Sequence, residues 1–420
     1  MSWEGYFRMQ EFKSLFKNYK FIALWVSQIL SQLTVNILSF LILIKLFQET
    51  GSSIATSLVW IAYAVPAIIV GPIAAGVVDF VDKKTILMTT NLLQALTVLI
   101  YAILLYKNLI FLPYAIVLVY SFLNQFYVPA EAAALPLFVS DNFLPQANSI
   151  FFITQQSSLI VGFGLAGVFN EILGFRTTVI LVAFLLFAAF IAATFLPRRK
   201  PGNKLAEEFE ARVSGFFDEI VEGYRFIKNS HKILLPFSLL LGLQVIIAVI
   251  VTNLPRIATD VLLVPAAQSG FFVMLPAGLG AVIGTIIVSK VLSSKFKKGN
   301  LIFISMLIFA FVIGAATIVL PFIGIDALRI GIGSILFMIV GFSVVGVLVP
   351  SITYLQEQTP EKLLGRVFGN FWFLTTIVTV LPVLFSATIT DLLGIRWLLL
   401  FLSLISLLAI IIVRRETYRL

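Results

Sequence analysis

The chain lacks cysteine and is poor in histidine and in charge. Without cysteine among its 420 residues it can form no disulfide, thiolate metal site or cysteine nucleophile. Its one histidine, His231, gives little basis for a histidine metal centre or general base. Charged residues make up 12% of the chain, against roughly 25% in soluble domains, and hydrophobic residues make up 60%. These numbers indicate a polytopic membrane protein and predict no metal and no cofactor.

Long apolar runs predict twelve transmembrane helices. About 20 residues are needed to cross the hydrocarbon core of a bilayer. Runs close to or above that length lie at 20–46, 53–79, 84–106, 109–138, 145–168, 177–196, 232–257, 266–291, 300–322, 329–355, 364–389 and 396–413. They lack the strict alternation of strands in a membrane barrel, so the expected fold class is all-α.

The basic residues predict how these helices are oriented. Twelve spans place both termini on one side, and 23 of the 29 Lys and Arg residues fall on that side. By the positive-inside rule both termini are cytoplasmic, in a cytoplasmic (inner) membrane. The same distribution explains the net charge of +9 without a nucleic-acid partner. The first apolar run is too long for a signal peptide and follows charged residues, so no cleavable signal is expected.

A polar stretch after the sixth run divides the chain into two halves. The expected organisation is a six-helix bundle at 1–196, a linker at 197–231 and a second six-helix bundle at 232–420. Within the linker, apolar residues recur at helical spacing and predict an amphipathic helix along the cytoplasmic face. They are Phe209, Val213, Phe216, Ile220, Tyr224 and Ile227.

A weak internal repeat relates the two halves. Glu171-Ile-Leu-Gly174-Phe-Arg176, before the sixth run, recurs 220 residues later as Asp391-Leu-Leu-Gly394-Ile-Arg396. Two similar six-helix units around a midline site are the architecture of a rocking transporter. A single-chain pore is a weaker interpretation, because the sequence shows no ring of charges and no filter loop.

The loop after the second run carries a family signature. Gly76-Val-Val-Asp79-Phe-Val-Asp82-Lys83-Lys84 resembles the loop 2–3 signature of the major facilitator superfamily, with Phe80 in place of its first basic residue and Asp82 in place of its second glycine. Five further segments resemble the branch of that family that contains macrolide-efflux and enterobactin-exporter-like proteins. They are Leu24-Trp25-Val-Ser27-Gln28, Gly71-Pro72, Val128-Pro129-Ala130 with Ala134-Leu135-Pro136, Glu222-Gly223-Tyr224-Arg225-Phe226-Ile227 and Leu364-Gly365-Arg366-Val367-Phe368.

The resemblance implies a cytoplasmic latch between the halves. A carboxylate at Asp79 would face the unpaired N–H groups and the guanidinium of Arg366 at the start of the eleventh helix. The expected gating residues are Gly76, Asp79, Asp82, Lys83, Lys84 and Arg366. In the alternative interpretation these are solvated helix-end charges, and the two lysines chiefly determine topology.

Polar residues at helical spacing mark the inner faces of several spans. Gln28, Gln32 and Asn36 form one stripe, and Tyr120, Asn124, Tyr127 and Glu131 form a second. The resemblance implies that such spans surround a central cavity, which gives a substrate-binding set. It consists of Gln28, Gln32, Asn36, Trp60, Tyr63, Tyr120, Asn124, Tyr127, Gln155, Gln156, Gln244, Asn370 and Trp372. The alternative is hydrogen bonding between helices, to which Asn91 and Gln94 are assigned.

Glu131 is the expected proton-coupling residue, because it is the carboxylate that we place within the membrane-embedded part of the cavity. The alternative is an ion pair with Lys83 or Lys84. Three departures weaken exchange with protons: Val35-Asn36 stands where many relatives have an acid, the span-four arginine of the drug exporters is missing, and Phe163 replaces a proline of the glycine motif.

The sequence therefore predicts a secondary transporter that exports a bulky amphipathic or lipophilic compound by alternating access. It would work as a proton-coupled antiporter with a role in antibiotic resistance, as a monomer among membrane lipids. The alternatives are an uncoupled facilitator or lysolipid flippase, and a non-transporting receptor or scaffold of the same fold. An enzyme is not expected, because no nucleophile–base pair, metal-ligand cluster or phosphate loop is found.

Overall fold

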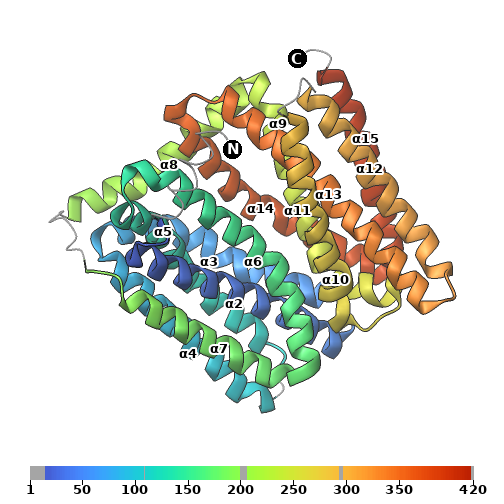
Figure 1. Ribbon diagram of the computed structural model, residues 1–420, viewed down its shortest axis with the longest axis horizontal. Coiled ribbons are helices and arrows are strands. Elements are labelled where there is room, and N and C mark those ends of the chain that lie inside the picture. The colour runs from blue at the N-terminus through green and yellow to red at the C-terminus, as the bar shows by residue number, and fades with distance from the viewer. Residues whose placement is uncertain (1–14, 108, 199–205, 293–296, 418–420) are drawn as a thin grey trace. The chain divides into compact units, whose positions relative to one another are not determined.

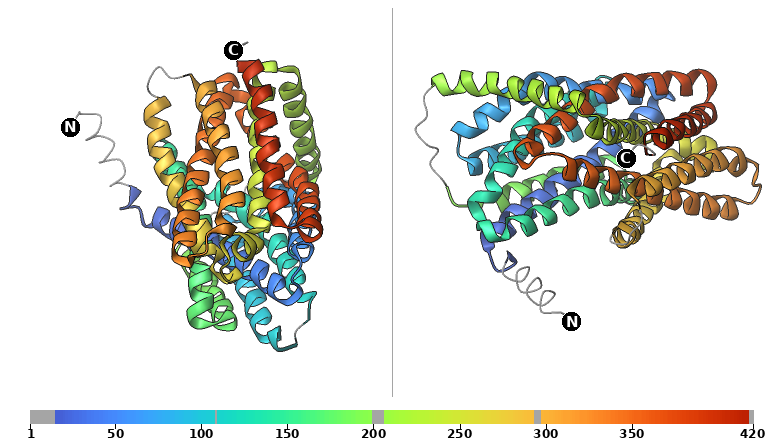
Figure 2. Two further views of the ribbon diagram at one scale, coloured as in Figure 1. Left: turned by 90° about the vertical axis from the view of Figure 1, so that its right-hand side faces the viewer. Right: turned by 90° about the horizontal axis from the view of Figure 1, so that it is seen from above.

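The computed structural model describes residues 15–107, 109–198, 206–292 and 297–417, and every regular element in these ranges is a helix (Figure 1 and Figure 2). The predicted all-α fold is confirmed. The twelve long helices at the predicted positions are α2 (Tyr19–Thr50), α3 (Ser53–Phe80), α4 (Lys83–Leu104), α5 (Leu112–Phe138), α6 (Leu144–Leu173), α7 (Phe175–Thr194), α9 (His231–Thr252), α11 (Leu275–Leu292), α12 (Lys298–Val319), α13 (Asp326–Gln358), α14 (Glu361–Leu393) and α15 (Ile395–Thr417).

In the described ranges, ten helical segments are long and apolar enough to cross a membrane. The other two predicted spans are α5 and α15. Asn124, Gln125 and Glu131 interrupt the apolar character of α5, and the apolar part of α15 covers only Ile395–Ile411. Large apolar side chains on the helix surfaces, such as Phe184 and Phe311, are each 67% exposed. Such exposure suits a lipid environment and would be costly in water.

The chain falls into two compact units. Unit 1 consists of the described residues of Met1–Ile42 and Ala62–Phe216, and unit 2 consists of those of Leu43–Ile61 and Phe217–Leu420. The end of α2 and the start of α3 therefore belong to unit 2, whereas the remainder of both helices belongs to unit 1. The domain boundaries at 196/197 and 231/232 stay a prediction.

Unit 1 is packed around an apolar core from α2, α4 and α5. Phe21, Leu87 and Ala130 are buried in it, and α4 packs along α7 and α5 (Figure 1). Asn18 fixes the start of α2, since its side-chain amide donates to the Phe138 carbonyl over 2.8 Å and its oxygen accepts the Lys20 N–H. Prolines in the first turns of α5 and α6 suit these positions, where a backbone N–H has no helical acceptor.

In unit 2, two glycines allow α11 and α13 to approach closely. A Cβ atom on Gly280 would lie 1.7 Å from the Met338 carbonyl oxygen, and one on Gly341 would lie 1.7 Å from that of Ala277. Only glycine fits at this contact, which is the small-residue packing common between membrane helices. Unit 2 also pairs α12 with α15 and α9 with α14 (Figure 1).

The connection from α9 to α11 is irregular and is held by a buried arginine. It contains the short helix α10 (Leu254–Ile257), a π-helical turn at Ala258–Leu262 and Leu263 in a left-handed conformation. Arg329 of α13 donates to the carbonyl oxygens of Leu262 and Ile323 over 2.8 and 3.0 Å and pairs with Asp326. These partners compensate the burial of its charge and fix the loop ends.

The predicted repeat is present in the backbone. α6 ends at Gly174 with φ 79° and α14 ends at Gly394 with φ 93°, and each helix resumes directly as α7 or α15. The N–H groups of these glycines bond to the carbonyls of Asn170 and Thr390 over 3.1 and 2.9 Å. The same turn therefore joins the last two helices of each half.

Candidate functional site

A buried polar network joins α2, α4 and α5 in unit 1. The Tyr127 hydroxyl donates to Oε1 of Glu131 over 3.0 Å, and both side chains stand one turn apart on α5. Ser27 and Ser31 of α2 lie beside the Tyr127 hydroxyl. Asn91 of α4 donates to Oγ of Ser27 over 3.1 Å. These five residues, here called the Glu131 network, form a path of neutral hydroxyl and amide groups that ends at one carboxyl group.

Glu131 is buried, with 7% of its surface exposed, and makes no ion pair with another described residue. The alternative pairing with Lys83 or Lys84 is not observed. Lys83 donates to the carbonyl oxygens of Val78 and Val81, and Lys84 donates to that of Thr194. The two lysines therefore bind helix-end carbonyls, where a cation is favoured.

The α2 stripe makes contacts with α6 and with its own helix. Gln28 is buried and donates to the Phe151 carbonyl of α6 over 3.2 Å, while its Oε1 has no partner among the described residues. Asn36 donates to the Gln32 carbonyl, and a Cβ atom on Gly162 would lie 2.6 Å from Cβ of Asn36. Gly162 thus permits the close helix approach expected of the glycine motif, and Gln28 serves as an interhelical contact.

The remaining candidates of unit 1 lie on α3, α5 and α6. Tyr120 is buried, and its hydroxyl lies beside the Thr34 side chain of α2. Asn124 lies beside the hydroxyl of Tyr63, a residue 37% exposed. Gln155 and Gln156 are exposed on α6. Their part in substrate binding stays a prediction.

The substrate-binding candidates of unit 2 differ in how far they are exposed. Trp372 is 53% exposed, Trp60 and Gln244 are half-buried, and Asn370 is buried. Asn370 donates to the Arg366 carbonyl over 2.9 Å. A Cβ atom on Gly223 would lie 2.3 Å from the side-chain amide nitrogen of Asn370, so Asn370 contacts the linker helix.

The linker helix α8 (Ala206–Asn229) packs on α14 through the Glu222-Gly223 pair. Gly223 allows the close approach, and Glu222 forms an ion pair of 2.6 Å with Arg366. Of the predicted apolar residues, Ile227 is buried and Tyr224 is 50% exposed. The position of the apolar face of α8 along the cytoplasmic surface stays a prediction. Phe209, Val213 and Phe216 have side chains outside the described part.

The loop 2–3 residues are partly described. Gly76 is buried in α3, and Asp82 accepts a hydrogen bond of 3.2 Å from the Thr85 hydroxyl at the start of α4. The side chain of Asp79 lies outside the described part of the structure. The latch between Asp79 and Arg366 therefore stays a prediction.

Residues 24–382 match the family model of the Major Facilitator Superfamily, which covers most of the helical fold described above. The chain belongs to this superfamily. An MFS-type transporter of Bacillus subtilis (strain 168), YfiS, is 26% identical over 403 residues, or 91% of this chain and 90% of that protein. The family accounts for the loop signature and the twelve-helix plan together.

Two further relatives are named as efflux proteins. The multidrug efflux pump Tap of Mycolicibacterium fortuitum is 25% identical over 379 residues, covering 85% of this chain and 86% of Tap. Macrolide efflux protein A of Streptococcus pyogenes is 26% identical over 226 residues, covering 53% of this chain and 54% of that protein. The crystal structure of the nucleoside transporter NupG superposes with a TM-score of 0.68 at 11% identity, covering 95% of this chain and 98% of NupG, which supports the MFS fold alone.

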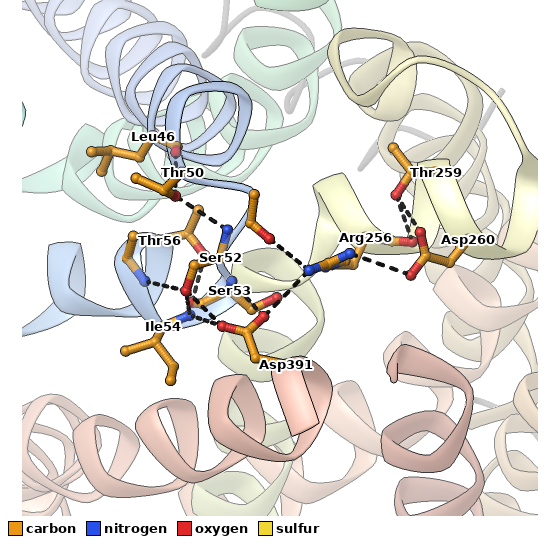
Figure 3. Close-up of polar contacts among 12 residues, drawn as sticks. Leu46, Thr50, Ser52, Ser53, Ile54, Thr56, Arg256, Thr259, Asp260 and Asp391 are labelled. Atoms are coloured by element: carbon orange, nitrogen blue, oxygen red, sulfur yellow. Dashed lines mark hydrogen bonds and ion pairs between the residues drawn. The ribbon is translucent and has the colours of Figure 1, made fainter. Parts of the chain in front are cut away.

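Sequence reasoning missed a second polar cluster, around Asp391 of α14 and Arg256 of α10 in unit 2 (Figure 3). The repeat drew attention to Asp391, but nothing in the local sequence indicates its partners. Ser31 of the Glu131 network was also missed, although its position four residues after Ser27 on α2 places both hydroxyls on one helix face.

Proposed function

We propose that this MFS transporter exports a bulky amphipathic or lipophilic compound across the cytoplasmic membrane by alternating access, coupled to inward movement of protons. The observation that carries the proposal is the Glu131 network, a buried carboxyl group whose side-chain contacts within the described residues are all neutral. The efflux names of Tap and macrolide efflux protein A support the direction. The candidate binding residues are uncharged, which suits cargo without phosphate or strong negative charge.

The network provides a place where one proton could be held in each cycle. Glu131 accepts the Tyr127 hydrogen bond through one oxygen, and the Tyr127 hydroxyl also lies beside Ser27 and Ser31. When Glu131 takes up a proton, Tyr127 can turn its own proton to a serine oxygen, so neither group is left unsatisfied. Protonation would thus change the contacts between α5 and α2, and this change is the proposed link between proton and helix movement.

The decisive experiment is efflux of a lipophilic cationic dye from cells that produce the protein, with and without a protonophore, over a range of external pH. We expect the protonophore to abolish efflux. We expect Glu131→Gln, which keeps size and hydrogen bonding but cannot release a proton, to lower efflux at least about tenfold and to remove its pH dependence. Glu171→Gln, at an exposed carboxylate of α6, is the matched control. Full pH dependence in Glu131→Gln would show that the proton is held elsewhere.

The second candidate is an uncoupled facilitator or lysolipid flippase, favoured by the small number of charged groups at membrane depth. Efflux that survives the protonophore would support it. A receptor or scaffold of the same fold would give no efflux and no stabilisation by any candidate substrate. In either case the protein would keep the MFS fold.

We also propose that Asp79 and Arg366 form the cytoplasmic latch when the protein is closed on that side. Arg366 is paired with Glu222 of α8 in this structure, so the guanidinium would exchange one carboxylate for another during the cycle. Asp79→Asn is then expected to shift the distance between spin labels on the cytoplasmic ends of the two units and to lower efflux several-fold. Unchanged distances and efflux would contradict the latch. Asp218→Asn, at an exposed residue of α8, serves as the control.

A further inference from the structure

Asp391, at the end of α14, binds the turn between α2 and α3 (Figure 3). Ser52 donates its hydroxyl to Oδ2 over 2.6 Å, and the backbone N–H groups of Ser53 and Ile54 donate to Oδ1 and Oδ2 over 2.8 and 3.0 Å. These amides open α3 and have no acceptor within the helix. A carboxylate there is favoured by the hydrogen bonds and by the helix dipole.

Arg256 of α10 joins the same cluster from a third element. Its guanidinium donates to the Gly51 carbonyl over 2.6 Å and lies 3.5 Å from Oδ1 of Asp391 and 3.8 Å from Oδ2 of Asp260. It also lies over the Phe47 ring, 5.1 Å from the centroid. One arginine therefore holds the last turn of α2, the α2–α3 turn and the end of α14 together.

The turn held in this way is covalently continuous with unit 1. Residues 43–61 belong to unit 2, but the remainder of α2 and of α3 belongs to unit 1. The turn lies at the end of α3 opposite the loop of Lys83 and Lys84, which positive charge predicts to be cytoplasmic. It is therefore at the predicted outer end.

The contacts of Asp391 with α3 and Arg256 can break without leaving α3 uncapped or a charge buried. Besides donating to Asp391, the Ser52 oxygen accepts the N–H groups of Ile54 and Ala55 over 3.1 and 3.4 Å. Ser52 would thus still cap α3 if Asp391 moved away, and the first turn of α3 would stay helical. The side chains of Asp391 and Arg256 are 16% and 27% exposed, so water can solvate both after separation.

We propose that Ser52, Arg256 and Asp391 form an outer lock, which holds the α2–α3 turn on α10 and α14 and must open before the transporter can face outward. The inference rests on the proposed alternating-access function and assigns a gating role to three residues outside the candidate binding set. The energetic principle is that one ligand-free state is favoured by a few charge-assisted hydrogen bonds that the other state lacks.

The test is a distance measurement between spin labels in the full-length protein in lipid. The chain has no cysteine, so Ile172→Cys in unit 1 and Phe322→Cys in unit 2, both at exposed positions, can be labelled without background. We expect Asp391→Ala to raise the population of the longer distance at least fivefold. The control is Asp218→Ala, at an exposed residue of α8, which should leave the distribution unchanged.

Two further variants keep the proposal open to contradiction if Asp391→Ala does not fold. Arg256→Gln should shift the same population in the same direction. The double variant Ser52→Cys with Asp391→Cys should form a disulfide under oxidation, and this cross-link should stop efflux until it is reduced. An unchanged distance distribution in folded Asp391→Ala or Arg256→Gln would overturn the lock, as would full efflux by the cross-linked protein. If the labels respond to Asp391→Ala but the protein moves no dye, the lock stands and the proposed cargo is wrong.

Discussion

The two turns that end α6 and α14 have the same backbone and different side-chain surroundings. Gly174 and Gly394 have φ values of 79° and 93°, and an acid stands three residues before each. Glu171 is exposed, whereas Asp391 is half-buried where it binds Ser52, Ser53, Ile54 and Arg256. The repeat therefore fixes how the chain turns but not how deeply the acid is buried, and the two turns differ in this respect.

The greater burial of Asp391 arises from the helix start that packs against the end of α14. In unit 2, Asp391 meets a helix start that is bonded to it across 337 to 339 positions of sequence. A shorter acid suits this place, because the aspartate carboxylate stands close to the end of α14 and reaches two amides at once. Halves related by a repeat can thus keep one backbone turn while the acid in it lies in different surroundings.

Glycine substitution at both turns is the largest stability effect that this comparison predicts. The ψ values of Gly174 and Gly394 are 161° and 155°, in a region of positive φ that is essentially reserved for glycine. A Cβ atom added to either glycine would meet no other atom within 4 Å, so the cost of Gly174→Ala and Gly394→Ala is backbone strain alone. We expect each to lower the free energy of unfolding by about 1–3 kcal/mol.

Thermal unfolding of the two variants in the same detergent would measure this effect. We expect the two decreases in the free energy of unfolding to agree within about 0.5 kcal/mol, because the surroundings of both turns should add no more than an ordinary surface substitution does. Gly331→Ala, at a helical glycine of α13 that also has open space around it, is the control and should be neutral or stabilising. A clear difference between the two turns would mean that the shared backbone is not equally important in the two halves.

Much of the fold could be predicted from the sequence, because the signals are local. Apolar runs gave helices close to their observed positions, and the Gly174 and Gly394 turns follow from a residue that tolerates positive φ. The interhelical hydrogen bond predicted for Asn91 is confirmed by its contact with Ser27, whereas the one predicted for Gln94 is not found among the described residues. These features depend on residue type and spacing within a few turns of chain.

The sites were harder to predict, because they depend on contacts between distant segments. Arg366 was assigned to a latch with Asp79, but the partner observed is Glu222, whose neighbour Gly223 brings α8 onto α14. Asp391 stood out only through the repeat, and its serine and amide partners are ordinary in sequence. Hydrogen bonds between residues more than 300 positions apart leave no periodic pattern, so tertiary packing alone decides them.

The smallest expected effect concerns the two caps of α3, the local one from Ser52 and the distant one from Asp391. Ser52→Ala removes one hydrogen bond to Asp391 and the acceptor of the Ile54 and Ala55 N–H groups, but Asp391 still accepts from Ser53 and Ile54. Ser52→Ala should therefore lower the free energy of unfolding by about 0.5–1 kcal/mol, the low end for loss of an N-cap. Ser57→Ala, whose hydroxyl bonds only to its own helix at Ile54, is the matched control and should cost less. In the Asp391→Ala background the same Ser52→Ala change should cost more, because the serine is then the remaining cap. Chemical denaturation of the two single variants and the double variant measures this coupling, and strict additivity would show that Ser52 and Asp391 do not share the cap.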